Sequence, residues 1–152
     1  MCDNYDLWPP IEDWIRDCFP NLPPDQYQET SELTCLYNCI AWAAEDTDNW
    51  WWPSEDAFWP VEIVDDSVAS FEHAFNVSRN YEPCDDGELE AGFQKVAVYA
   101  VGIHVKHMAR QTENGLWTSK LGFGWDISHY TTASLICPQY GDSISYLRRP
   151  AP

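Results

Sequence analysis

The stretch "FQKVAVYAVGIHVKHMARQ", from Phe93 to Gln111, decides the fold of this 152-residue chain. Apolar and polar residues alternate along much of it, and β-branched and aromatic residues are frequent, which is typical of a β-strand. Gly102, near its middle, predicts a bend or a bulge. We therefore expect a long β segment here, with a sheet built around it.

Further strand signals follow this segment. "ENG" (113–115) is a hairpin turn signal, and "LWTSKLG" (116–122) returns as the partner strand. "SISYLRR" (143–149) has the pattern of a last strand, whereas "WDISHYTTASLI" (125–136) is ambiguous between a short helix and a loop. The second half of the chain therefore predicts an antiparallel sheet.

Helical patterns precede the strands. A short helix is expected from Ile11 to Cys18, and an amphipathic helix within "DDSVASFEHAFN" (65–76). Between them, "CIAWAAE" (39–45) contains good helix formers. That helix has two possible starts, because either Thr34 or Asn38 could be its N-cap.

The order of these elements, with helices first and an antiparallel sheet second, indicates the α+β class. Residues 1–33 are rich in proline and acidic residues, and we expect them to form an N-terminal arm packed on the domain. Residues 34–149 are expected to form a single α+β domain, with residues 150–152 as a tail.

The composition is strongly acidic, with 25 acidic residues, 8 basic residues and a net charge of -17. Such a protein repels phosphate groups, so direct binding to nucleic acid or to an anionic membrane is not expected. Solubility, a cationic partner or mimicry of nucleic acid could each explain the acidity. The chain shows no membrane-spanning stretch and no signal-peptide pattern, and we expect a cytoplasmic protein.

The six cysteines have no secreted context, so free thiols are expected rather than disulfides. Cys35 and Cys39 could share a helix face, and His104 and His107 resemble a pair of zinc ligands. Residues three apart on a regular strand point to opposite faces, however, so we expect no metal site. Phosphate-loop, dinucleotide-binding and EF-hand patterns are absent, and no cofactor is expected.

Cys39 is the best candidate nucleophile. If Asn38 caps the helix, Cys39 lies in its first turn, where the helix dipole lowers the pKa of a thiol. His107, on the long β segment, could serve as the base, and either Asp126 or His129 could orient it. Cysteine, histidine and a polar residue occur in this order in papain-like hydrolases.

Each of these residues also has a simpler interpretation. A free cysteine such as Cys39 is commonly a small buried residue. Cys35 is a rival nucleophile, although no capping group follows it. His107 is preferred to His104 because polar residues continue on its face as far as Gln111, yet a surface histidine would fit equally well.

Other residues could support such a site. Asn38 and Lys120 are weaker candidates for stabilising an oxyanion. Trp42, Trp51 and Trp117 could form an aromatic wall around a ligand, although tryptophan more often packs in cores and loops.

Several motifs occur in order between about Phe19 and Arg149. They include "YNCIAWA" with "WWWP" (37–53), "HMARQ" (107–111) and "GLWTSKLG" (115–122). On these motifs the chain resembles a widespread, uncharacterised bacterial domain family, a resemblance that implies no activity. Its layout is similar to that of papain-like and NlpC-type cysteine hydrolases, which implies N-terminal helices packed on a small antiparallel sheet.

Two functional hypotheses follow. The first is a thiol hydrolase or acyltransferase acting on an amide or ester bond, with Cys39 as nucleophile and His107 as base and acid. The second is a non-enzymatic interaction module of the immunity or inhibitor type, which would use its acidic surface to bind a basic protein or another cationic partner.

Overall fold

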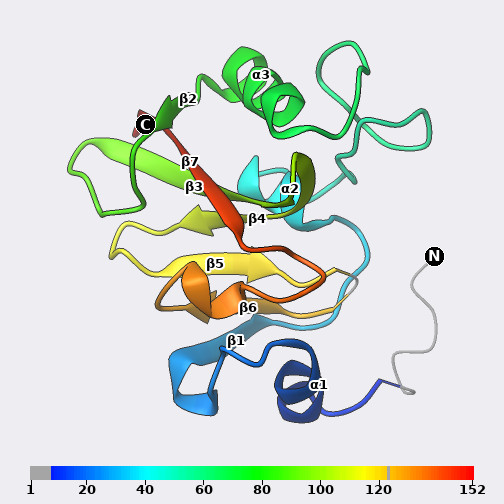
Figure 1. Ribbon diagram of the computed structural model, residues 1–152, viewed down its shortest axis with the longest axis vertical. Coiled ribbons are helices and arrows are strands. Elements are labelled where there is room, and N and C mark those ends of the chain that lie inside the picture. Colours follow the sequence, from blue (N-terminus) through cyan, green and yellow to red (C-terminus); the bar gives the residue numbers. More distant parts are fainter. Residues whose placement is uncertain (1–7, 123) are drawn as a thin grey trace.

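A seven-stranded antiparallel sheet dominates the protein (Figure 1). The structure is a computed structural model that describes residues 8–122 and 124–152. The strand order is β1-β6-β5-β4-β3-β7-β2, so β1 and β2 are the two edge strands. The strands are β1 (Tyr27–Ser31), β2 (Glu82–Cys84), β3 (Phe93–Val101), β4 (His104–Gln111), β5 (Trp117–Lys120), β6 (Asp126–His129) and β7 (Ser143–Pro150).

The helices of the described residues are short and lie around this sheet. They are α1 (Ile11–Cys18), α2 (Cys39–Ala43) and α3 (Val68–Arg79), with 3-10 turns η2 (Pro24–Gln26) and η3 (Ala133–Leu135). Figure 1 shows α3 beside β2 at one end of the sheet and α1 beside β1 at the other. In the described part of the chain, no helix is both long and apolar enough to cross a lipid bilayer.

The expected papain-like arrangement is wrong. The seven-stranded sheet is the main structural element, and α2, which carries Cys39, has five residues. The sheet is larger than expected partly because Tyr27–Ser31, in the proposed arm, and Asp126–His129, in the ambiguous segment, both form strands and pair with each other. Strands this short are stabilised by their neighbours rather than by their own pattern, so the sequence does not reveal them.

The segment that decided the fold behaves as expected. Phe93–Val101 and His104–Gln111 pair as antiparallel strands. Gly102 lies in the turn between them with a φ of 62°, a value that glycine adopts easily. The predicted bend is therefore confirmed, and a register shift after Tyr99 adds a bulge within the pair.

Each face of the sheet covers a separate hydrophobic core. Successive residues of a strand point to opposite faces, so Val96 and Val98 join the core beneath α2 and α3. Ala97 and Tyr99, between and beyond them, join the core that includes Ile15 of α1. The sheet is therefore buried on both faces, and it separates the side chains of one core from those of the other.

Asn38 caps α2, which settles the choice between the two helix starts. Its Oδ1 accepts a hydrogen bond from the backbone N–H of Ala41 at 3.1 Å. The same oxygen accepts from the N–H of Trp51 at 3.1 Å, and the Asn38 Nδ2 donates to the Trp51 carbonyl at 2.8 Å. One side chain therefore fixes both the start of the helix and the tryptophan-rich segment that follows it.

Candidate functional site

Cys39 begins α2 and lies almost fully inside the core. The backbone of Met108, on β4, acts to lower the pKa of the Cys39 thiol. Burial nevertheless dominates and raises the pKa of Cys39 to about 11. The thiol is therefore protonated and shielded at neutral pH, a poor state for a nucleophile.

The rival nucleophile has no free thiol. Cys35 is disulfide-bonded, so the expectation of free thiols is wrong for this residue. The free cysteines among the described residues are Cys18, Cys39, Cys84 and Cys137.

Lys120 and Asp126 face each other across β5 and β6, on the same side of the sheet as Cys39. The Lys120 ammonium donates to the carbonyls of Thr34 and Gly124 and is fully buried. Burial lowers the pKa of Lys120 to about 8, against the opposing effect of Asp126. Two of its three N–H donors are therefore used by backbone carbonyls, and neither is directed toward an oxyanion.

Asp126 is held by hydroxyl groups rather than by a histidine. Its Oδ2 accepts hydrogen bonds from Tyr37 and Ser31, each at 2.5 Å. The structure therefore does not place Asp126 against His107, the ring that it was proposed to orient.

His107 lies on the opposite face of the sheet from Cys39. Its neighbour Met108 packs in the core with Cys39, so the alternation along β4 turns His107 to the other side. There its ring stacks on Tyr140, with 4.1 Å between centroids and an angle of 5° between planes. Its Nδ1 has no hydrogen-bond partner among the described residues. Cys39 and His107 are therefore not brought together.

Gly141 explains how Tyr140 reaches this position. Its φ is 86°, and a Cβ added there would lie 2.0 Å from the carbonyl oxygen of Ala100. Only glycine allows the turn to approach β3 this closely. The tight approach fixes the neighbouring tyrosine ring over His107.

His107 belongs to a buried polar chain that the sequence did not reveal. Its Nε2 lies 3.0 Å from the Ser119 hydroxyl, which lies 2.8 Å from the Nε2 of His129. The Nδ1 of His129 lies 2.8 Å from the Thr131 carbonyl, which can only accept. His129 therefore donates through Nδ1 and accepts from Ser119, and Ser119 accepts from His107.

The hydrogen bonds from Ser119 to His129 and from His129 to the Thr131 carbonyl run in the same order as those of a serine nucleophile, a histidine base and an orienting acceptor. Ser119 is fully buried, however, and closed to a substrate. Burial lowers the pKa of His129 to about 4 and the pKa of His107 well below its usual value, so both rings are neutral at pH 7. These hydrogen bonds can fix the positions of side chains in the core, and they present no exposed reacting group. Among the described residues, no group of three or more His, Cys, Asp or Glu side chains could hold a metal ion.

The three proposed wall residues do not share a wall. Trp51 is buried in the core beneath α2 and α3, whereas Trp117 is buried in the core on the other face. Trp42 is partly exposed, and its indole N–H donates to the Thr118 hydroxyl at 3.1 Å. All three contribute to packing. Only Trp42 remains partly exposed, and the guanidinium of Arg110 lies over its ring.

Basic side chains are drawn inward, and acidic ones face outward. Of the eight lysines and arginines, Arg16 and Lys106 are exposed. The half-buried or buried ones are Arg79, Lys95, Arg110, Lys120, Arg148 and Arg149. The outer surface is therefore even more anionic than the net charge alone indicates.

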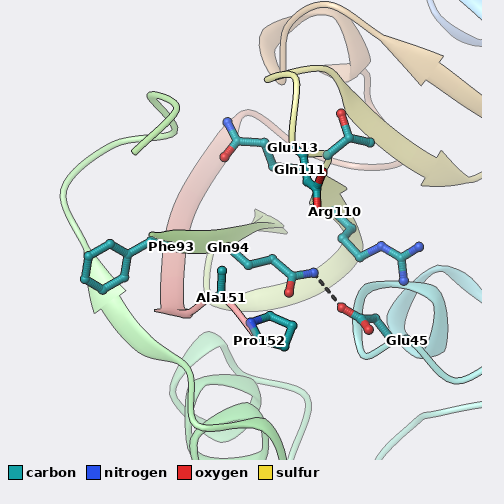
Figure 2. Close-up of a pocket in the computed structure, with 9 residues that line it drawn as sticks. Glu45, Phe93, Gln94, Arg110, Gln111, Glu113, Ala151 and Pro152 are labelled. Atoms are coloured by element: carbon teal, nitrogen blue, oxygen red, sulfur yellow. Dashed lines mark hydrogen bonds between the residues drawn. The ribbon is translucent and has the colours of Figure 1, made fainter. Parts of the chain in front are cut away.

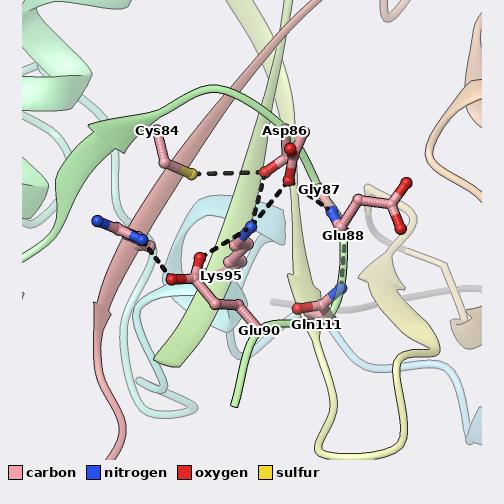
Figure 3. A network of polar contacts seen from close by, with 8 residues as sticks. Cys84, Asp86, Gly87, Glu88, Glu90, Lys95 and Gln111 are labelled. Atoms are coloured by element: carbon pink, nitrogen blue, oxygen red, sulfur yellow. Dashed lines mark hydrogen bonds and ion pairs between the residues drawn. The ribbon is translucent and has the colours of Figure 1, made fainter. Parts of the chain in front are cut away.

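Figure 3 shows one place where a basic side chain is drawn inward. Lys95 is 2% exposed, and its ammonium lies 3.1 Å from Asp86 and 3.4 Å from Glu90. Arg148 also pairs with Glu90. These contacts hold the segment between β2 and β3 against the sheet.

Comparisons with known proteins place the chain in a family without assigning an activity. No curated protein matches it significantly, and no solved structure does either. A family model matches residues 28–148, most of the chain, which confirms the expected membership of an uncharacterised domain family. The protein belongs to the family described as "Domain of unknown function (DUF7689)".

Proposed function

We propose that the protein is a non-enzymatic interaction module that binds a basic polypeptide. The observation that carries this proposal is the segregation of charge, with six of the eight basic residues half-buried or buried and most acidic residues exposed. A surface of one sign attracts partners of the opposite sign and accelerates their association.

The free edge of β1 is the docking place that we assign to such a partner. β1 pairs with β6 along one side, and no strand among the described residues pairs with its other side. The three central residues, Gln28, Glu29 and Thr30, are exposed. An open edge can accept an extended peptide as an additional strand, with backbone hydrogen bonds supplying affinity.

A cavity beside this edge suits a basic side chain. It has a volume of about 310 Å³ and is lined by Glu29, Glu32, Leu33 and Trp125. Two carboxylates would attract a lysine or arginine, and the indole and leucine would cover its methylene groups. The edge and the cavity together would recognise a strand that carries positive charge.

The geometry favours this hypothesis over a thiol hydrolase. A hydrolase of the expected type needs the sulfur of Cys39 within reach of the His107 ring. The sheet lies between these two side chains, and both are buried. Each has a place in a packed core without any catalytic role.

The test measures the binding of a short peptide of alternating lysine and valine residues, by calorimetry at low salt. The variant Glu29→Gln/Glu32→Gln removes two charges from the β1 edge. The matched control Glu55→Gln/Asp56→Asn removes two exposed charges from the loop before α3. We expect the first variant to weaken binding about tenfold and the control less than about twofold.

Equal weakening by the two variants would show that the peptide samples the whole acidic surface, and the β1 site would be abandoned. Failure of the wild-type protein to bind the peptide at low salt would overturn the interaction module itself. Added salt should weaken binding, because it screens exposed charges.

A further inference from the structure

A second cavity has an unusual cation at its wall. It has a volume of about 410 Å³, and Glu45, Gln94, Arg110, Glu113 and Ala151 are among the residues that line it. Figure 2 shows the side chains of Arg110 and Glu45 at the same end of this cavity. A volume of this size is within the usual range for sites that bind small molecules.

The guanidinium of Arg110 is fixed by contacts with Trp42. Its Nη1 donates to the Trp42 carbonyl at 2.9 Å. Its central carbon lies 4.0 Å from the centroid of the Trp42 ring, a cation–π contact. A cation held in this way is already oriented before a ligand arrives, so little entropy is lost when one binds.

The other edge of this guanidinium has no protein acceptor. Nε and Nη2 form the edge opposite Nη1, and no described residue accepts a hydrogen bond from either atom. No carboxylate of the described residues lies within 4.0 Å of Arg110, although the protein has 25 acidic residues. Arg149 shows the contrast, because it pairs with Glu45 at 2.8 Å.

Burial makes this free edge more significant. It lowers the pKa of Arg110, because the charged form is partly removed from water, and Glu45 opposes that effect. Partly buried donors that bond to no protein group favour an acceptor supplied from outside. Two parallel N–H groups on a planar guanidinium match the two oxygens of a carboxylate.

We propose that this cavity binds a small ligand through a carboxylate group, which accepts both hydrogen bonds from the Nε and Nη2 edge of Arg110. A singly charged carboxylate suits the site better than a phosphate dianion. Glu45 and Glu113 line the same cavity, and the whole protein carries a charge of -17, so each additional negative charge on the ligand costs more. This inference is independent of the proposed binding at β1.

The experiment is a titration with N-acetylglycine, which has a carboxylate and no amine. NMR signals of the Arg110 Nε–H and the Trp42 indole N–H monitor binding during the titration. Saturable shifts of both signals are expected, with a dissociation constant in the millimolar range. Arg110→Lys keeps the charge but removes the fork, and we expect it to weaken binding at least about tenfold. Arg16→Lys, at an exposed site, is the matched control and should bind as the wild type does.

A second variant guards against a folding defect in Arg110→Lys. Ala151→Trp places a large ring in the cavity from an exposed position and leaves Arg110 and its contacts in place. It should abolish the shifts, while its thermal unfolding stays close to that of the wild type. Absence of saturable shifts in the wild type would overturn the proposal. So would equal binding of N-acetylglycine by the wild type and both cavity variants.

Further probes define the ligand. Inorganic phosphate should bind more weakly than N-acetylglycine, and the reverse order would overturn the assignment to a carboxylate. Glycinamide, which lacks the carboxylate, should not shift the Arg110 signal, and a shift of equal size would count against the proposal. An acetylated tripeptide with a free carboxyl end distinguishes the source of the carboxylate. Tighter binding of the tripeptide assigns the site to a chain terminus, and weaker or equal binding assigns it to a small metabolite.

Discussion

Two opposing effects act on the thiol of Cys39. The start of a helix and a backbone N–H favour the thiolate, whereas burial disfavours it. The five-residue helix α2 provides only a weak dipole, and the sulfur is almost fully removed from water. Burial is the stronger effect, and it raises the pKa of Cys39 to about 11.

The first prediction therefore concerns thiol reactivity. With iodoacetamide in native buffer, Cys18 and Cys84, which are partly exposed, should be alkylated at least about ten times faster than Cys39. Mass spectrometry of timed samples measures each rate. Fastest modification at Cys39, slowed by His107→Ala, would instead support the thiol-hydrolase hypothesis.

At the scale of elements, Asn38 joins α2 to the tryptophan-rich segment. The Asn38→Ala variant loses the helix cap and leaves the backbone N–H and carbonyl of Trp51 without their partner. We expect the free energy of unfolding to fall by about 3 kcal/mol, the sum of a lost cap and unpaired buried groups. Urea unfolding measures this loss.

Ser67→Ala is the matched control for that prediction. Ser67 caps α3 by accepting a hydrogen bond from the N–H of Ser70 at 3.2 Å. Unlike Asn38, its side chain does not also bond to the backbone of a second segment among the described residues. Its loss should cost about 1 kcal/mol. Equal losses in the two variants would mean that the contacts between Asn38 and Trp51 contribute little.

For the whole molecule, the buried histidines predict sensitivity to acid. Burial lowers the pKa of His129 from 6.5 to about 4 in the folded protein, whereas the unfolded chain keeps the ordinary value. The unfolded state therefore binds more protons between these two values, and stability falls as the pH falls through this window. His107 acts in the same direction. At the acid end His129 alone should account for a loss of about 3 kcal/mol.

The measurement is urea unfolding at several pH values between 6.5 and about 4. The variant His129→Gln removes one titrating group, so its stability should depend less steeply on pH in this window. His73→Gln, which removes an exposed histidine from α3, is the control. An unchanged pH dependence in His129→Gln would show that its ring does not couple folding to protonation.

The sequence by itself determined the features that depend on neighbouring residues. The alternation from Phe93 to Gln111 predicted a β segment with a bend at Gly102, and the structure has both. The amphipathic helix within 65–76 and the possible cap at Asn38 were also readable, because a helix periodicity and a capping side chain act over a few residues. Family membership followed from motifs in order along the chain.

The tertiary structure alone decided which side chains meet. The sequence placed Cys39 near a helix start and His107 on a strand. It could not show that these two side chains lie on opposite faces of the sheet. The hydrogen-bonded chain through Ser119 and His129 was equally hidden, because it depends on the register between the paired strands β4, β5 and β6. Register is set by packing on both faces of the sheet, and shifting a strand by one residue would exchange its two faces. Local patterns therefore predicted the elements, whereas the contacts across the sheet determined which of their side chains could form a site.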